Sequence, residues 1–141
     1  MAEVTAEETF SAPDSLNNIE EGREPFLEAE RIALRPILEN IEDSPKILEV
    51  GTGHGALSTL LPDRLKKNLV QTDVYKHMVK EMQRRDPRSQ LIVASGYKLP
   101  FGDEAFPVVM GLSAYDVFED LDEAVKESSR VLSGGGNLYI F

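Results

Sequence analysis

Three closely spaced glycines and two acids are the residues of this chain best suited to hold a small molecule. Gly51, Gly53 and Gly55 follow a short apolar run that contains Glu49, and a helix-like segment comes next. Glycines let the backbone turn tightly and let a ligand approach atoms that a β-carbon would cover. Asp73 stands at the end of the next apolar run, where a carboxylate can accept hydrogen bonds from both hydroxyls of an adenosine ribose. The pattern predicts a site for a nucleotide-type cofactor.

The identity of that cofactor depends on Glu49. Gly51, Gly53 and Ala56 also match the G-x-G-x-x-A pattern of dinucleotide-binding domains. Three features oppose a dinucleotide: the charge of Glu49 beside the loop, the long helix predicted before the first strand, and the extra freedom given by Gly55. S-adenosylmethionine carries an ammonium, a sulfonium and a carboxylate but no phosphate, so an acid near the loop suits it better. The alternative is that Glu49 merely ends a strand in solvent.

The elements that position these residues are predicted from the apolar pattern. Apolar residues three and four positions apart indicate an amphipathic helix over 25–41, with Pro36 inside it. Strands are predicted over 46–50, 68–72, 91–94, 106–110 and 138–141, and helices over 54–61, 76–85 and 121–132, the last ended by the glycines at 134–136. This alternation is typical of βαβ units and predicts an α/β fold with a parallel sheet.

The length and charge of the chain indicate one domain behind an acidic arm. The 141 residues suit a single core, and the formal net charge is −10. Residues 1–24 are rich in acids and poor in periodic apolar residues, so we expect a mobile arm there and the folded domain over 25–141. An acidic domain repels phosphate backbones and anionic lipid heads, which disfavours nucleic acid or a membrane as partner.

Other classes of site and location are disfavoured by what the sequence lacks. There is no cysteine, so disulfides and thiolate metal sites are excluded. His54 and His77 have no second histidine or acid at ligand spacing, so no metal site is predicted. The first residues do not resemble an export signal and no run is long enough to span a bilayer, so a cytoplasmic location is expected.

These motifs resemble the class I S-adenosylmethionine-dependent methyltransferases, in particular the group that methylates small molecules. The similarity runs from about residue 30 to Phe141. It implies a three-layer Rossmann-like fold, with sheet order 3-2-1-4-5 and helices on both faces. It also implies S-adenosylmethionine as the cofactor and a small molecule as the methyl acceptor.

The resemblance assigns most of the cofactor site to three stretches that follow strands. The cofactor-binding residues that it implies are Glu49, Gly51, Thr52, Gly53, Gly55, Asp73, Val74, Met78, Ser95, Gly96 and Leu112. In this family Asp73 would hold the ribose, Val74 and Met78 would pack on the adenine, and Ser95 and Gly96 would border its amino edge. The family commonly has an aspartate where Ser95 stands, so a hydroxyl would replace a carboxylate there.

No residue is assigned to catalysis by the sequence. Methyl transfer is an in-line displacement at a sulfonium carbon, for which positioning supplies most of the assistance. Tyr115 and Asp116 are the nearest candidates for a base. Packing of Tyr115 and helix capping by Asp116 are the favoured interpretations.

The end of the chain departs from the family pattern. Family members usually continue past the fifth strand, whereas this sequence ends with an apolar strand at 138–141 that would have an open edge. We therefore expect either a fragment of a longer protein or a second copy or partner that covers this edge. Two other functions stay open: an NAD(P)-dependent oxidoreductase domain, and a non-catalytic cofactor-binding or structural module.

Overall fold

The computed structural model describes residues 24–141, with side chains from Glu28 onward, so the predicted arm lies almost wholly outside the described residues. The elements are α3 (Glu24–Asn40), β1 (Ile47–Val50), α4 (Ala56–Leu60), α5 (Asp63–Lys66), β2 (Leu69–Asp73), α6 (Lys76–Arg85), β3 (Gln90–Val93), β4 (Phe106–Gly111), the 3-10 turn η1 (Tyr115–Val117), α7 (Leu121–Val131) and β5 (Leu132–Ile140). No helix of this part of the chain is long and apolar enough to cross a membrane.

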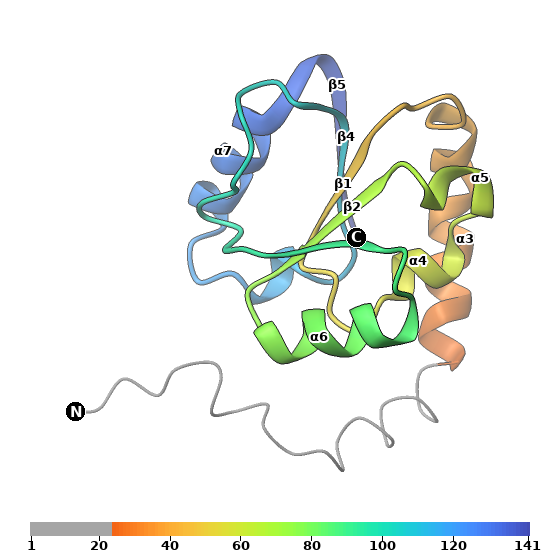
Figure 1. Ribbon diagram of the computed structural model, residues 1–141. Helices are drawn as coiled ribbons and strands as arrows, with labels where there is room; N and C mark the ends of the chain where they lie inside the picture. The colour runs from red at the N-terminus through yellow and green to blue at the C-terminus, as the bar shows by residue number, and fades with distance from the viewer. Residues whose placement is uncertain (1–23) are drawn as a thin grey trace.

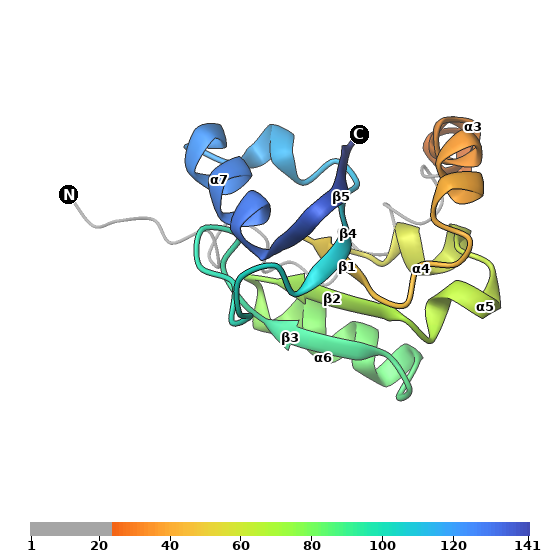
Figure 2. The same cartoon turned by 90° about the horizontal axis from the view of Figure 1, so that it is seen from above.

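The five strands form one parallel sheet in the order β3-β2-β1-β4-β5. The predicted Rossmann-like fold and strand order are thereby confirmed. Figures 1 and 2 show α3 and α4 on one side of the sheet and α7 on the other. Because side chains alternate along a strand, Ile47 joins a core with Leu34 and Leu57, while Leu48 joins one with Ala124 and Val131. Both faces of the sheet are therefore covered, as parallel sheets require.

The connection from β1 to β2 differs from the prediction. One helix was expected over 54–61, but the structure has two short ones, α4 and α5, separated at Leu61 and Pro62. Leu61 is extended, with φ −69° and ψ 140°, because the ring of a following proline disfavours the helical conformation. Pro62 then caps α5.

The last strand begins earlier than predicted. We expected the glycines at 134–136 to end the preceding helix and a strand over 138–141. Instead α7 ends at Val131, and the next residue, Leu132, already pairs with Phe106. Asn137 pairs with Val108, so residues 133–136 bulge out of the ladder opposite a single residue of β4. The glycines therefore shape a bulge in β5, which is the edge strand of the sheet.

Arg130 ties the chain between β3 and β4 to α7. Its guanidinium donates to the carbonyl oxygens of Leu99 (3.1 Å) and Phe101 (2.9 Å) and to the carboxylates of Asp103 (2.8 Å) and Glu127 (2.8 Å). Glu127 in turn accepts from the backbone N–H of Leu99 at 2.7 Å. These contacts raise the pKa of Arg130 and lower that of Glu127, so both stay ionised. The network fixes a helix-free connection that borders the site described below.

Arg130→Lys is expected to lower the free energy of unfolding by more than the control below does, because a lysine cannot span several acceptors as the planar guanidinium does. Urea unfolding followed by circular dichroism measures the change. The matched control is Arg64→Lys, which alters an exposed pair with Glu42 and should cost less than about 0.5 kcal/mol. Equal losses in the two variants would contradict the role given to Arg130.

Candidate cofactor site

A cavity of about 490 Å³ lies beyond the carboxyl ends of the strands. Ten of the eleven residues predicted for the cofactor line it: Glu49, Gly51, Thr52, Gly53, Asp73, Val74, Met78, Ser95, Gly96 and Leu112. Parallel strands end at the same edge of a sheet, so residues distant in sequence meet there. The structure therefore brings together the acid before the loop, the loop itself and the acid at the end of β2.

Position 51 of the glycine loop has no room for a side chain, because the segment that contains Ala114 lies against it. Gly51 has φ +73°, and a β-carbon there would come within 2.6 Å of Cβ of Ala114. The N–H groups of Gly51 and Thr52 both donate to the carbonyl oxygen of Thr72, at 2.9 and 2.8 Å. The turn is thus anchored to the neighbouring strand β2. Gly53 has φ +50° and nothing near its missing β-carbon, so its backbone is open to the cavity.

Asp73 holds the loop from the other side. Its Oδ2 accepts a hydrogen bond from the N–H of Gly53 at 2.8 Å, and its Oδ1 accepts one from the N–H of Tyr75 at 2.9 Å. Each carboxylate oxygen has a second lone pair, so both can still accept a hydroxyl. The side chain is 5% exposed. Asp73 is therefore fixed in place with acceptor capacity left on the cavity side.

Glu49 is a buried acid at the inner end of the cavity. It is 1% exposed, so the alternative that it merely ends a strand in solvent is wrong. Gln71 donates from Nε2 to Oε2 of Glu49 at 2.8 Å and to Oγ1 of Thr52 at 2.6 Å. Burial raises the pKa of Glu49 to about 8; hydrogen bonds from Gln71 and Thr52 oppose the rise, and the charges of Asp73 and Glu30 add to it. Near neutral pH Glu49 therefore carries a proton that a nearby cation would displace.

Gly55 is the one predicted residue that lies outside the cavity lining. It has φ +80° and caps the start of α4. A β-carbon on Gly55 would come within 2.3 Å of the methyl group of Met82 on α6. Gly55 is therefore required for the helix start and for the approach of α6, which are structural reasons for a glycine.

The wall of the cavity farther from the loop is largely apolar. Val74 is 54% exposed and Tyr97 is 40% exposed at the rim. Gly96 lies under the ring of Phe118, which would be 2.4 Å from a β-carbon there. The rings of Tyr97 and Phe118 are 5.2 Å apart. Phe118 was missed in the sequence because it lies in an irregular connection, where no periodic pattern identifies it.

The two candidates for a catalytic base, Tyr115 and Asp116, do not line the cavity. Tyr115 is 2% exposed, and its hydroxyl is 2.6 Å from Oγ of Ser128. Burial raises its pKa, so Tyr115 is a packed core residue that does not line the cavity. Asp116 is exposed and also lies outside the lining. The expectation that Asp116 caps a helix is wrong, because Asp116 lies inside η1. The residue that caps α7 is Asp120, which accepts from the N–H of Glu123 at 3.0 Å.

The histidines differ in position. His54 lines the cavity and His77 is exposed on α6. Within residues 24–141 no group of three or more His, Cys, Asp or Glu side chains is arranged to hold a metal ion.

Gly51→Ala and Gly53→Ala should separate the loop's structural and binding roles. Both place alanine at positive φ, at a cost of about 1 kcal/mol. Only Gly51→Ala also collides with Ala114, so its free energy of unfolding should fall by about 1–3 kcal/mol more than that of Gly53→Ala. Thermal melting and titration with S-adenosylhomocysteine measure both effects. Gly53→Ala should weaken binding while losing only the cost of alanine at positive φ, about 1 kcal/mol, and unchanged binding would contradict the loop's place in the site.

Comparison with known proteins shows which family has this fold and loop. The family model for the methyltransferase domain matches residues 48–140. The chain belongs to the methyltransferase domain family. This methyltransferase domain is 33% identical over 99 residues to demethylmenaquinone methyltransferase of Chlorobaculum tepidum. That alignment covers 70% of this chain and 41% of the relative, so the chain spans less than half the length of that relative.

Solved structures agree on the fold of the methyltransferase domain. A Methanococcus maripaludis protein assigned as an S-adenosyl-L-methionine-dependent methyltransferase superposes with a TM-score of 0.70 at 22% identity, covering 90% of this chain and 60% of that one. The methyltransferase CalH, whose structure is a complex with S-adenosylhomocysteine, superposes with a TM-score of 0.59 at 22% identity, covering 67% and 31%. The family match favours the methyltransferase interpretation over the oxidoreductase one.

Proposed function

We propose that this domain binds S-adenosylmethionine in the cavity beyond the sheet and belongs to an enzyme that transfers its methyl group. The observation that carries this proposal is the charge of the cavity. Among the described residues its lining includes the acids Asp73 and Glu119 and no lysine or arginine. Glu49 adds a third carboxyl group, which would give up its proton to a cationic ligand. A ligand with an ammonium and a sulfonium is attracted by such a cavity, whereas the pyrophosphate of a dinucleotide is repelled.

The described residues divide into two regions that fit the two ends of this cofactor. Asp73, with acceptor capacity left on both oxygens, would receive the ribose hydroxyls. The apolar rim of Val74, Tyr97 and Phe118 would receive the adenine face. At the other end Glu49 would receive the ammonium. When bound, the cofactor would supply an activated methyl group on sulfur.

The acceptor is proposed to be a small molecule with an apolar portion. Val117 is 78% exposed and Leu112 is buried, and both line the same cavity. Apolar side chains at the mouth favour an apolar ligand. The relative from Chlorobaculum tepidum is named for an apolar acceptor, demethylmenaquinone. No side chain is assigned as a base, because Tyr115 and Asp116 lie outside the lining and positioning supplies most of the assistance in this reaction.

Thermal denaturation with added ligands tests the proposal. At about 100 times its dissociation constant, a ligand that binds only the folded state adds about 2.7 kcal/mol to the free energy of unfolding. S-adenosylmethionine and S-adenosylhomocysteine should each raise the melting temperature, and NAD should not. A response to NAD alone would favour the oxidoreductase alternative, and no response to any of the three would favour a structural module.

A further inference from the structure

A second and larger cleft lies on the face of the sheet that α4 covers. Its volume is about 700 Å³, and it lies between the α4–α5 crossover and α6, over residues of β2. Residues of both short helices line it, Ser58 and Thr59 from α4 and Asp63 and Lys66 from α5. Its size is in the range of sites for small molecules. His54 lines both this cleft and the cofactor cavity, so the glycine loop separates the two.

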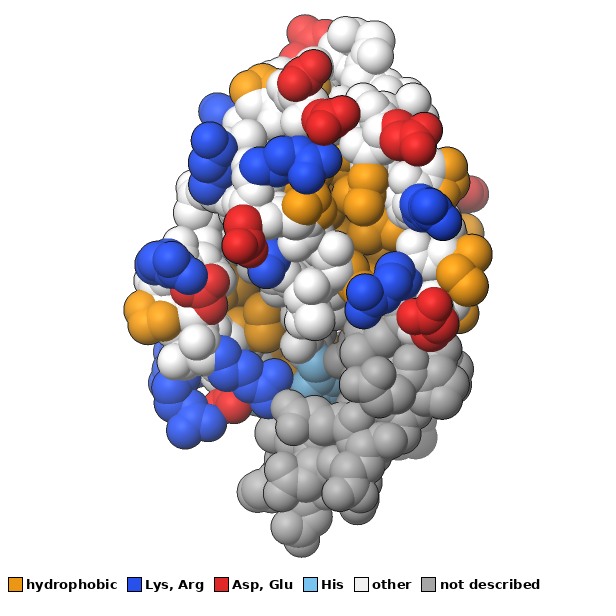
Figure 3. Space-filling view, turned by 90° about the vertical axis from the view of Figure 1, so that its right-hand side faces the viewer, with side chains coloured by type: hydrophobic (Ala, Val, Ile, Leu, Met, Phe, Trp, Pro, Cys, Tyr) orange, Lys and Arg blue, Asp and Glu red, His pale blue; other side chains and the backbone are white. Residues whose placement is uncertain are grey.

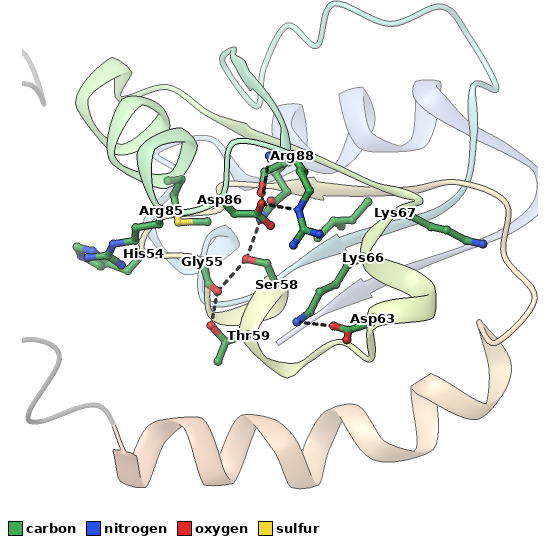
Figure 4. Close-up of a pocket in the computed structure, with 14 residues that line it drawn as sticks. His54, Gly55, Ser58, Thr59, Asp63, Lys66, Lys67, Arg85, Asp86 and Arg88 are labelled. Atoms are coloured by element: carbon green, nitrogen blue, oxygen red, sulfur yellow. Dashed lines mark hydrogen bonds and ion pairs between the residues drawn. The ribbon is translucent and has the colours of Figure 1, made fainter.

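The rim of this cleft is cationic. Lys66 and Lys67 end α5, Arg85 ends α6, and Arg88 follows in the next turn. We name this site the basic cleft. In Figure 4 the ends of Lys66 and Arg88 reach toward the middle of the cleft beside Ser58, whereas Lys67 points to its outer side. Figure 3 shows Lys and Arg side chains along this face of the molecule, with Asp and Glu side chains among them.

The carboxylates near the basic cleft do not balance its cations. Four cationic side chains line the cleft among the described residues, from Lys66, Lys67, Arg85 and Arg88, and two carboxylates do, from Asp63 and Asp86. Arg85 also pairs with Glu81, which lies outside this lining. Lys67 has no ion pair with another described residue. The described lining of the basic cleft therefore has more cations than carboxylates.

The pairs that do form at the basic cleft are exposed. Asp63, which pairs with Lys66 at 3.1 Å, is 98% exposed, and Arg88, which pairs with Asp86 at 3.3 Å, is 93% exposed. Exposed pairs contribute little free energy, because water and salt screen them. An anion with several charges that enters the cleft can therefore replace the carboxylates.

We propose that the basic cleft binds the phosphate group of a small phosphate ester or diphosphate. Phosphate oxygens accept charge-assisted hydrogen bonds from guanidinium and ammonium groups, and a concave cationic wall concentrates the field on a small anion. The acidic charge of the rest of the chain repels large polyanionic surfaces. The proposal does not depend on the function of the cofactor cavity, since Lys66 and Arg88 line only the basic cleft.

Titration of the labelled protein with inorganic pyrophosphate and with glycerol 3-phosphate, at fixed ionic strength, tests the proposal. Amide spectra should show saturable shifts confined to the neighbourhood of 54–67 and 85–89. In the double variant Lys66→Gln with Arg88→Gln the dissociation constant should rise about tenfold. The control is the double variant Lys126→Gln with Arg31→Gln, which removes one lysine and one arginine from exposed pairs outside the cleft. In this control the dissociation constant should change less than about twofold.

Several results would overturn the assignment. These are shifts that never saturate, equal weakening in both double variants, or tighter binding to phosphatidylglycerol vesicles or single-stranded DNA than to pyrophosphate. The single variant Arg88→Gln, expected to weaken binding about threefold, is measured alongside, so that poor folding of the double variant does not leave the result open. Titration with S-adenosylhomocysteine reports separately on the cofactor cavity.

Discussion

Asp73→Asn should weaken the binding of S-adenosylhomocysteine about 100-fold, because two charge-assisted hydrogen bonds to the ribose would lose their ionised acceptor. The substitution keeps the size of the side chain and one carbonyl oxygen. That oxygen can still accept one of the two backbone N–H groups, from Gly53 or Tyr75, that Asp73 now holds. Isothermal titration calorimetry measures the loss of affinity, and thermal melting measures the accompanying change in stability.

The matched control for this prediction is Asp86→Asn. Asp86 follows α6 and accepts the N–H of Arg88, two residues ahead, at 3.1 Å, in the same way that Asp73 accepts the N–H of Tyr75 at 2.9 Å. It lies outside the cofactor cavity. Asp86→Asn should therefore leave S-adenosylhomocysteine binding within about twofold of the wild type. A loss of affinity of the same size in both variants would mean that Asp73 acts only through local structure.

Glu49→Gln should make the ligand-free protein more stable at high pH. The pKa of Glu49 is raised from 4.5 to about 8, so the folded state holds this proton more tightly than the unfolded chain does. The resulting stabilisation is fully present below pH 4.5 and is lost as the pH rises to 8. A glutamine does not ionise, so the variant's free energy of unfolding should exceed the wild type's by about 2–4 kcal/mol at pH 8.5. The gain should vanish near pH 4.5, as urea unfolding at the two pH values can measure.

The same substitution should weaken cofactor binding and remove its pH dependence. A cationic ligand favours the ionised form of Glu49, so the wild-type affinity should rise by up to about tenfold per pH unit between pH 6 and 8. Glu49→Gln should bind more weakly and show no such rise. The control is Glu119→Gln, which alters an exposed acid of the same cavity and should keep the pH dependence. A variant more stable than the wild type that still binds normally would contradict the role of Glu49.

The sequence predicted the sheet well because the alternation of apolar runs and periodic segments reports directly on parallel βαβ units. α6 was predicted with the bounds that the structure gives, since its polar face and its ends are clear in the sequence. The helix predicted before Pro62 ended at Leu61, one residue beyond α4, but the helix α5 after Pro62 was missed, because its four residues are too few to show an apolar period. The start of β5 was missed because glycines usually end helices, and here they form a bulge that depends on pairing with β4.

The candidate site was predictable to the extent that it depends on backbone turns and strand ends. Glu49 and Asp73 were identified because each stands at a fixed place relative to a strand. Gly55 was assigned to the site because its contact with Met82 across the fold is not visible in the sequence. The packing of Tyr115 was predicted, although its partner Ser128 was not. Phe118 and the basic cleft could not be found at all, since each is made by segments that meet only in three dimensions.

A crystal structure of the protein with S-adenosylhomocysteine tests the central claim most directly. We expect the ligand in the cavity beyond the sheet, with its ribose hydroxyls hydrogen bonded to the carboxylate of Asp73 and its ammonium beside Glu49. A ligand bound elsewhere at saturating concentration, or one whose ribose lies away from Asp73, would contradict the account.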